Sequence, residues 1–216
     1  MKIYIIRHGE TNLNVAHVRQ GWMDEPLNEA GRRLAVITGR GLKGIRFDAC
    51  VSSPLSRAYE TVRLVLEESG NGGVPITTDD RLKEISFGIE EGMPVTESAL
   101  DPETAQLFYT DALNYPGAPG GESIRDVCRR TQDFLNELVQ KDDGKTWLIG
   151  THGCAMRAML NPLYADPEHF WQGHVPPNCA VTILEAHGGK ASILESDKVY
   201  YDTSLLVDHY RTTAHI

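Results

Sequence analysis

Two histidine-glycine pairs stand directly behind apolar segments of the kind that form buried strands. The first is Arg7-His8-Gly9 and the second is His152-Gly153. In open α/β sheets, ligands bind beyond the carboxyl ends of the strands. A cation, an imidazole and a glycine at such an end predict an anion site with a potential nucleophile in it, because glycine lets the backbone approach a ligand closely. For either motif alone, the alternative is a surface histidine beside a strand end.

Two further residues could join such a site. Arg57 falls in the first turn of a predicted helix that follows the strand 48–52. Its guanidinium could point back over the strand end, next to the positive helix N-terminus, although a solvated helix arginine is the alternative. Glu84 lies between apolar residues, which predicts a half-buried carboxylate. The alternative is a loop glutamate that pairs with Lys83 or Arg81.

Alternating strand and helix patterns predict an α/β fold: a three-layer sandwich, with a mostly parallel central sheet and helices on both faces. An antiparallel hairpin is expected at the edge of the sheet near the C-terminus. The expected strands are 3–6, 48–52, 75–78, 145–151, 179–186 and 190–195, and the expected helices are 28 to about 39–44, 54 onward, 102–113, 123–141 and 154–160. In such a sheet, four chemically active segments that are distant in sequence can meet at one edge.

Three glycines, Gly39, Gly41 and Gly44, fit the pattern GxGxxG. A dinucleotide site requires that pattern to follow a strand and open a helix. Here it closes a helix and precedes a strand, so the glycines indicate a helix stop and no dinucleotide cofactor.

Length and composition favour a single domain over residues 1–216, because 216 residues with 41% hydrophobic content can bury a sizeable core. The segment 89–122 has the character of an insertion that caps the site. It holds seven acidic residues and no lysine or arginine. The glutamates and aspartates are Glu90, Glu91, Glu97, Asp101, Glu103, Asp111 and Glu122.

A net charge of −9 argues against nucleic acid as a partner, because that function needs a basic face. Four widely spaced cysteines without a CxxC pair fit a reduced, cytoplasmic protein and argue against zinc. No apolar run approaches about 18 residues, so no membrane partner is expected. No metal is expected either, since the chain lacks a carboxylate cluster suited to magnesium and the expected cations are arginines.

The sequence resembles the histidine phosphatase superfamily, also called phosphoglycerate mutase-like. The matching blocks, in order along the chain, are RHGET at 7–11, Asn14, Gln20-Gly21, Asp24, Pro26-Leu27, SSPLSRAYET at 52–61, LKEISFGIEEG at 82–92 and THG at 151–153. The resemblance implies that His8 becomes phosphorylated and that Glu84 is the acid. It further implies that the phosphoryl group or the substrate is held by Arg7, Arg57, His152, Asn14, Gln20, Gly21 and Gly153.

We therefore predict a phosphatase of this family: a metal-independent phosphomonoesterase that acts on a small phosphorylated metabolite, as a monomer or homodimer. One alternative is a cofactor-dependent phosphoglycerate mutase, and another is a non-catalytic module that binds a phosphorylated ligand. The acidic 89–122 segment favours the phosphatase, because it should repel a bisphosphorylated intermediate. By the same argument the rest of the substrate should be neutral, aromatic or cationic, with Phe108, Tyr109 or Tyr115 as possible contacts.

Overall fold

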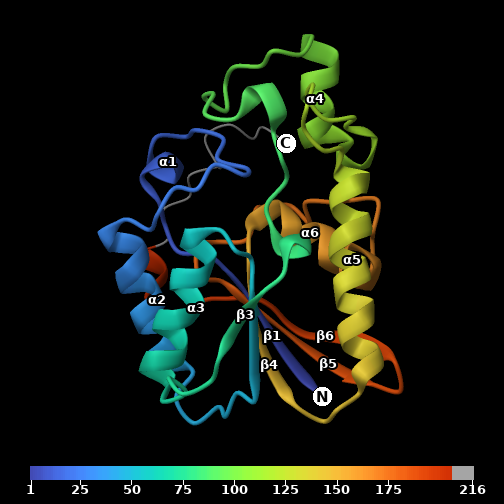
Figure 1. The fold of residues 1–216 in the computed structure, drawn as a ribbon. Helices are drawn as coiled ribbons and strands as arrows, with labels where there is room; N and C mark the ends of the chain where they lie inside the picture. The colour runs from blue at the N-terminus through green and yellow to red at the C-terminus, as the bar shows by residue number, and fades with distance from the viewer. Residues whose placement is uncertain (206–216) are drawn as a thin grey trace.

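In a computed structural model, which describes residues 1–205, the centre of the molecule is a six-stranded sheet with the order β3-β2-β4-β1-β5-β6 (Figure 1). Strands β1 to β4 are parallel, whereas β5 runs antiparallel to β1 and forms an antiparallel hairpin with β6. The mostly parallel sheet and the edge hairpin are therefore confirmed. The strands are β1 (Lys2–Arg7), β2 (Ala49–Ser52), β3 (Ile76–Thr78), β4 (Thr146–Thr151), β5 (Val181–His187) and β6 (Lys190–Lys198).

Helices cover both faces of the sheet, as the three-layer prediction requires. Alternate side chains of β1 point to opposite faces: Tyr4 and Ile6 pack in the cluster with α2 and α3, and Ile3 and Ile5 in the cluster with α5 and α6. Because β1 is buried on both faces, its sequence is a continuous apolar run instead of an alternating one. The covering helices are α2 (Glu29–Gly41), α3 (Ser56–Ser69), α5 (Ile124–Lys141) and α6 (Gly153–Leu160).

Helix starts agree with the sequence to within one residue for four of the five expected helices. Asn28 caps α2 by accepting from Gly31 N at 2.8 Å, and Ser123 caps α5. The expectation that Pro54 is the first residue of a helix is wrong, because α3 begins at Ser56. The Asp24 carboxylate accepts the Ser56 N–H at 2.7 Å, so this cap comes from a distant part of the chain.

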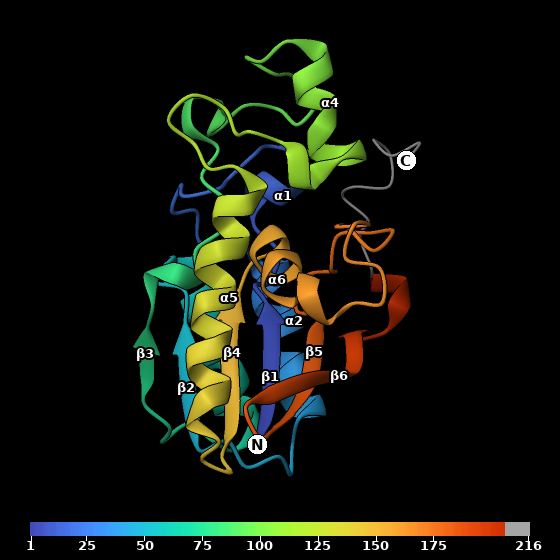
Figure 2. The same cartoon turned by 90° about the vertical axis from the view of Figure 1, so that its right-hand side faces the viewer.

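The carboxyl end of the sheet is covered by segments that lie outside the three layers, among them α1 (Asn12–Val15) and α4 (Pro102–Thr110) (Figures 1 and 2). The helix predicted over 102–113 is shorter, because it ends at 110 and is followed by a 3-10 turn. The 3-10 turns are η1 (Asp80–Leu82), η2 (Gly88–Glu90), η3 (Ala112–Asn114), η4 (Asn161–Leu163) and η5 (Thr203–Leu205). Residues 206–216, which the single-domain prediction includes, lie outside the described residues.

Aromatic side chains pack the segment 89–122 against the rest of the molecule. The Phe108 ring lies 5.1 to 5.9 Å from the rings of Phe87, Tyr115 and Trp171. Tyr115 is 3% exposed. These rings therefore pack the segment onto its neighbours, and of the three predicted substrate contacts Tyr115 is buried whereas Phe108 and Tyr109 are half-buried.

Candidate active site

The carboxyl ends of β1, β2 and β4 meet at one edge, and the first residues beyond them build the site. Arg7 pairs in register with Thr151, and Ser52 with Gly150. His8, Ser53 and His152 follow directly, so the parallel register alone brings the two histidine-glycine pairs together. The rings of His8 and His152 lie 5.1 Å apart between centroids.

His8 is fixed in one orientation. Its Nδ1 lies 2.7 Å from the carbonyl oxygen of Gly9, and its backbone N–H donates to Thr151 O at 3.0 Å. A carbonyl only accepts, so Nδ1 must carry the proton and Nε2 keeps its lone pair. The result is an imidazole whose free nitrogen is available as a nucleophile.

His152 is fully buried, and its Nε2 lies 2.8 Å from the hydroxyl oxygen of Ser53. Its Nδ1 has no hydrogen-bond partner among the described residues. The same holds for Nε of the fully buried Arg57. Buried polar atoms of this kind are rare in folded proteins, and two of them beside one nucleophile indicate a place for a polar ligand.

Both arginines predicted from the sequence lie in this site. The Arg7 side chain donates through Nη1 to the carbonyl of Pro176, and its Nε lies 3.5 Å from where a Cβ on Gly153 would stand. The Arg57 guanidinium donates to the carbonyl oxygens of Met23 at 2.7 Å, Gly21 at 2.8 Å and Gln20 at 3.0 Å. Two nearly buried guanidiniums make the site strongly cationic.

Burial and positive neighbours keep both imidazoles neutral. Burial lowers the pKa of His8 well below 6.5, and the positive charges of Arg57 and Arg7 lower it further. The hydrogen bond to the Gly9 carbonyl has a smaller, opposing effect. Burial, then Arg57 and His8, lower the pKa of His152 in the same direction. Burial also lowers the pKa of Arg57 to about 10, with Glu84 opposing it, so the guanidinium stays charged at neutral pH.

These shifts predict how stability depends on pH. Below about 6.5 the unfolded chain binds protons at both histidines that the folded chain does not bind, so the free energy of unfolding should fall as the pH drops and recover above 6.5. Urea unfolding from about pH 7.5 to about pH 5 tests this. A His8→Asn/His152→Asn variant should show a flatter decline, whereas His187→Asn, at a 94% exposed side chain, should follow the wild type. The prediction would be contradicted if the free energy of unfolding fell equally with pH in the wild type, the double variant and His187→Asn.

Glu84 is half-buried, as predicted, and its carboxylate is held by backbone donors. One oxygen accepts from Ala155 N at 2.9 Å and Ile85 N at 3.0 Å, and the other from Cys154 N at 3.1 Å. The first turn of α6 therefore fixes this carboxylate close behind His152. The alternative of a loop glutamate paired with Lys83 or Arg81 is wrong, because Lys83 pairs with Asp80 and Arg81 pairs with other acids, among them Asp79.

The remaining predicted site residues support the others. Asn14 is buried, and its side-chain oxygen accepts from Thr11 N at 3.2 Å. The Gln20 side chain accepts from the Thr11 hydroxyl at 2.9 Å. Gly21 offers its carbonyl to Arg57. In this structure Gln20 and Gly21 thus hold the guanidinium through their backbone.

Sequence reasoning missed several residues that shape the site. Thr61 accepts from Gly9 N at 2.9 Å, and the Asn178 amide donates to His8 O at 3.0 Å. Ser53 could have been found, because it follows β2 as His8 follows β1. Asn178 gave no signal, since 170 residues separate it from His8.

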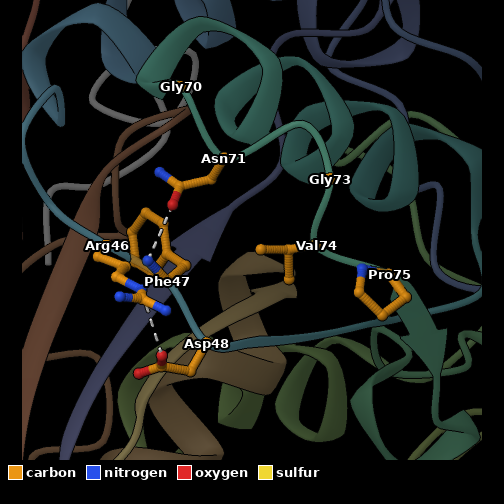
Figure 3. Close-up of a pocket in the computed structure, with 8 residues that line it drawn as sticks. All are labelled: Arg46, Phe47, Asp48, Gly70, Asn71, Gly73, Val74 and Pro75. Atoms are coloured by element: carbon orange, nitrogen blue, oxygen red, sulfur yellow. Dashed lines mark hydrogen bonds and ion pairs between the residues drawn. The ribbon is translucent and has the colours of Figure 1, made fainter.

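A hollow of about 540 Å³ lies at the opposite, amino-terminal edge of the sheet (Figure 3). Its polar side chains have partners within the hollow: Asn71 accepts from the backbone N–H of Phe47 at 3.0 Å, and Arg46 lies 3.8 Å from Asp48. The hollow contains none of the predicted site residues. Within residues 1–205, no group of three or more His, Cys, Asp or Glu side chains is arranged to hold a metal ion. No helix in that part of the chain has the length and apolar character needed to cross a membrane.

A mostly parallel sheet with two histidines and two arginines at its carboxyl edge defines a class of anion-binding α/β proteins, and comparison with known proteins specifies the family. Residues 3–198 match the family model of the histidine phosphatase superfamily (branch 1). The chain therefore belongs to that superfamily, as its motifs predicted.

Named relatives fall into two functional groups. The chain is 30% identical over 187 residues to a probable phosphoglycerate mutase, GpmB, of Yersinia pestis, covering 86% of this chain and 85% of that one. Among solved structures, Bacillus stearothermophilus YhfR superposes with a TM-score of 0.84 at 33% identity, over 92% of this chain and 97% of that one. A mycobacterial glucosyl-3-phosphoglycerate phosphatase, in complex with VO3, gives a TM-score of 0.78 at 28% identity, over 91% and 98% of the two chains.

Proposed function

We propose that the protein is a phosphomonoesterase that hydrolyses a small phosphorylated metabolite through a phosphohistidine intermediate on His8. The observation that carries the proposal is the neutral His8 imidazole, with Nδ1 tied to the Gly9 carbonyl, between two charged guanidiniums. Phosphoryl transfer depends mainly on positioning and on stabilising the charge of the equatorial oxygens. Arg7, Arg57 and His152 supply those donors in the proposed mechanism.

The proposed reaction has two steps. In the first, His8 Nε2 attacks phosphorus, the bond from phosphorus to the ester oxygen breaks, and Glu84 gives its proton to the departing alkoxide. In the second, Glu84 takes a proton from water, the water oxygen attacks phosphorus, and the P–N bond breaks to return neutral His8 and inorganic phosphate. The balance of protons leaves Glu84 protonated again for the next cycle.

The cap segment 89–122 favours small, singly phosphorylated substrates in this proposal. Three of its seven acids bond to the rest of the molecule, since Glu90 lies 3.7 Å from Arg19, Glu122 pairs with Arg130 at 2.7 Å and Glu91 accepts three backbone N–H groups. The other four are exposed, although Asp101 also caps α4 through Thr104 N, and the segment itself contains no lysine or arginine. These four are Glu97, Asp101, Glu103 and Asp111. Their charge disfavours bisphosphorylated ligands, although less than seven free carboxylates would.

A phosphoglycerate mutase is the second candidate, and the named relative from Yersinia pestis favours it. The two activities separate in one experiment. Phosphate release is measured over a panel of neutral alkyl and aryl monophosphates, phosphoglycerates and bisphosphorylated sugars. Conversion of 3-phosphoglycerate to 2-phosphoglycerate is measured with and without 2,3-bisphosphoglycerate.

We expect phosphate release with the highest kcat/KM for the neutral monophosphates and no stimulation by the bisphosphate. Equal or better turnover of the bisphosphorylated compounds would contradict the assigned role of the cap. Stimulated isomerisation faster than hydrolysis would make the protein a mutase. A wild type that binds vanadate but hydrolyses nothing in the panel would favour a non-catalytic binding module.

A further inference from the structure

One short loop, residues 20–24, touches the guanidinium of Arg57 and the backbone of Glu84, two residues of the proposed reaction. Three of its backbone carbonyls accept from the Arg57 guanidinium, at 2.7 to 3.0 Å. These bonds use both terminal nitrogens of that side chain. Any shift of the loop therefore moves the guanidinium that faces the phosphoryl group.

The carboxylate of Glu91 holds this loop in place. One oxygen accepts from Trp22 N and Phe87 N, each at 2.9 Å, and the other accepts from Met23 N at 3.1 Å. Hydrogen bonds to a charged acceptor are stronger than neutral ones, and here a single side chain receives three. Glu91 thus ties the loop to the segment that carries Glu84.

The contact between the loop and this segment is too close for a side chain at position 21. A Cβ on Gly21 would stand 2.2 Å from Ile85 O and 2.3 Å from the Glu91 carboxylate. The backbone of Gly21 is in close contact with the backbone of Ile85, so the position of the loop is set within narrow limits. Gly21 in the sequence motif is explained by this approach.

The same loop also reaches the proposed acid. The Trp22 indole N–H donates to the backbone carbonyl of Glu84 at 2.8 Å, and Arg130 donates to the same oxygen at 2.8 Å. The Lys83 ammonium lies 4.9 Å from the centre of the indole. Trp22 and Arg130 therefore hold the backbone from which the Glu84 side chain extends.

We propose that Glu91 and Trp22 are positioning residues that set the distance between the phosphoryl-holding guanidinium of Arg57 and the acid Glu84. The proposal rests on the function proposed above. Neither side chain contacts the reacting atoms: Glu91 acts on Arg57 through the loop carbonyls, and Trp22 acts on Glu84 through its backbone. Errors of about 1 Å in such distances can reduce a rate by about 100-fold.

The first test is Glu91→Gln, which keeps the size of the side chain but replaces one acceptor by an amide donor. Either Met23 N or the pair Trp22 N and Phe87 N then faces a donor. We expect kcat for p-nitrophenyl phosphate to fall by about 10-fold or more, and inhibition by vanadate to weaken, because the guanidinium is displaced. Glu185→Gln makes the same charge change at an exposed site on β5 and should behave as the wild type.

The second test is Trp22→Phe, which removes the indole N–H together with part of the ring area of a residue that is 47% exposed. We expect slower hydrolysis of alkyl phosphates, whose leaving group needs the proton from Glu84, and little change for p-nitrophenyl phosphate or for vanadate inhibition. A purely structural role would lower both substrates alike. Thermal unfolding of each variant checks that a loss of activity does not come from a loss of folded protein. If Glu91→Gln does not fold, the inference is tested on Trp22→Phe.

The inference would be overturned if folded Glu91→Gln kept the wild-type kcat and the wild-type inhibition by vanadate. It would also be overturned if Trp22→Phe slowed the hydrolysis of alkyl phosphates and of p-nitrophenyl phosphate equally. These outcomes can be distinguished from a failure of the proposed function. If the proposed function is wrong, the wild type itself releases no phosphate, and the inference about Glu91 and Trp22 is wrong as well.

Discussion

His8→Ala is expected to abolish phosphate release from every substrate, with kcat reduced by at least roughly 1,000-fold. The reason is that the hydrogen bond at Nδ1 of His8 leaves its Nε2 as the attacking atom in the proposed mechanism, whereas His152 is held by Ser53 through Nε2 at 2.8 Å and is assigned to the phosphoryl oxygens. The phosphoryl group bound by Arg7 and Arg57 would have no acceptor at the correct position. The measurement is hydrolysis of p-nitrophenyl phosphate at its pH optimum, together with detection of an acid-labile phosphoenzyme after rapid quenching.

The control is His187→Ala, which removes an imidazole whose side chain is 94% exposed at the far end of β5. It should retain wild-type turnover and the same labelled intermediate. Thermal unfolding should show that His8→Ala is folded, since the variant removes a buried polar ring that burial keeps neutral. Retention of a tenth of the wild-type rate, or label on a side chain other than His8, would remove the nucleophile assignment.

Much of the fold and of the site was predictable because parallel strands place their carboxyl ends together. Ile3 to Ile6 and the segment before His152 carry the continuous apolar pattern of strands that are buried on both faces. Because these two strands are parallel neighbours in the sheet, the residues that follow them lie next to each other, and the rings of His8 and His152 are 5.1 Å apart. Arg57 follows for the same reason, since its helix starts behind β2.

What the sequence did not reveal depends on the path of loops. The partners of Arg57 are backbone carbonyls of 20–23, and a carbonyl has no residue type that could mark it. Asn178 reaches His8 from 170 residues away. Pro54 was misassigned because the acid that caps α3 is Asp24, from another segment. The sequence singled out Phe108 and Tyr115 as possible substrate contacts but could not show that the two rings would pack against each other.

Glu84→Gln should slow esters with poor leaving groups far more than p-nitrophenyl phosphate. An alkoxide must receive a proton as its bond to phosphorus breaks, and general acid catalysis contributes about 100- to 10,000-fold. Nitrophenolate leaves without a proton, so only the activation of water in the second step is lost. A glutamine keeps one oxygen for Ala155 N and Ile85 N, so the side chain stays near its place.

The decisive measurement is therefore a leaving-group series rather than a single rate. Plotted against the pKa of the leaving alcohol, log kcat/KM of the variant should fall more steeply than that of the wild type, because the variant cannot supply the proton. Glu185→Gln, at an exposed site on β5, should reproduce the wild-type slope. Equal slopes with a uniformly lower rate would mean that Glu84 serves only to hold the first turn of α6 through Cys154 and Ala155, and the acid would have to be sought among other residues.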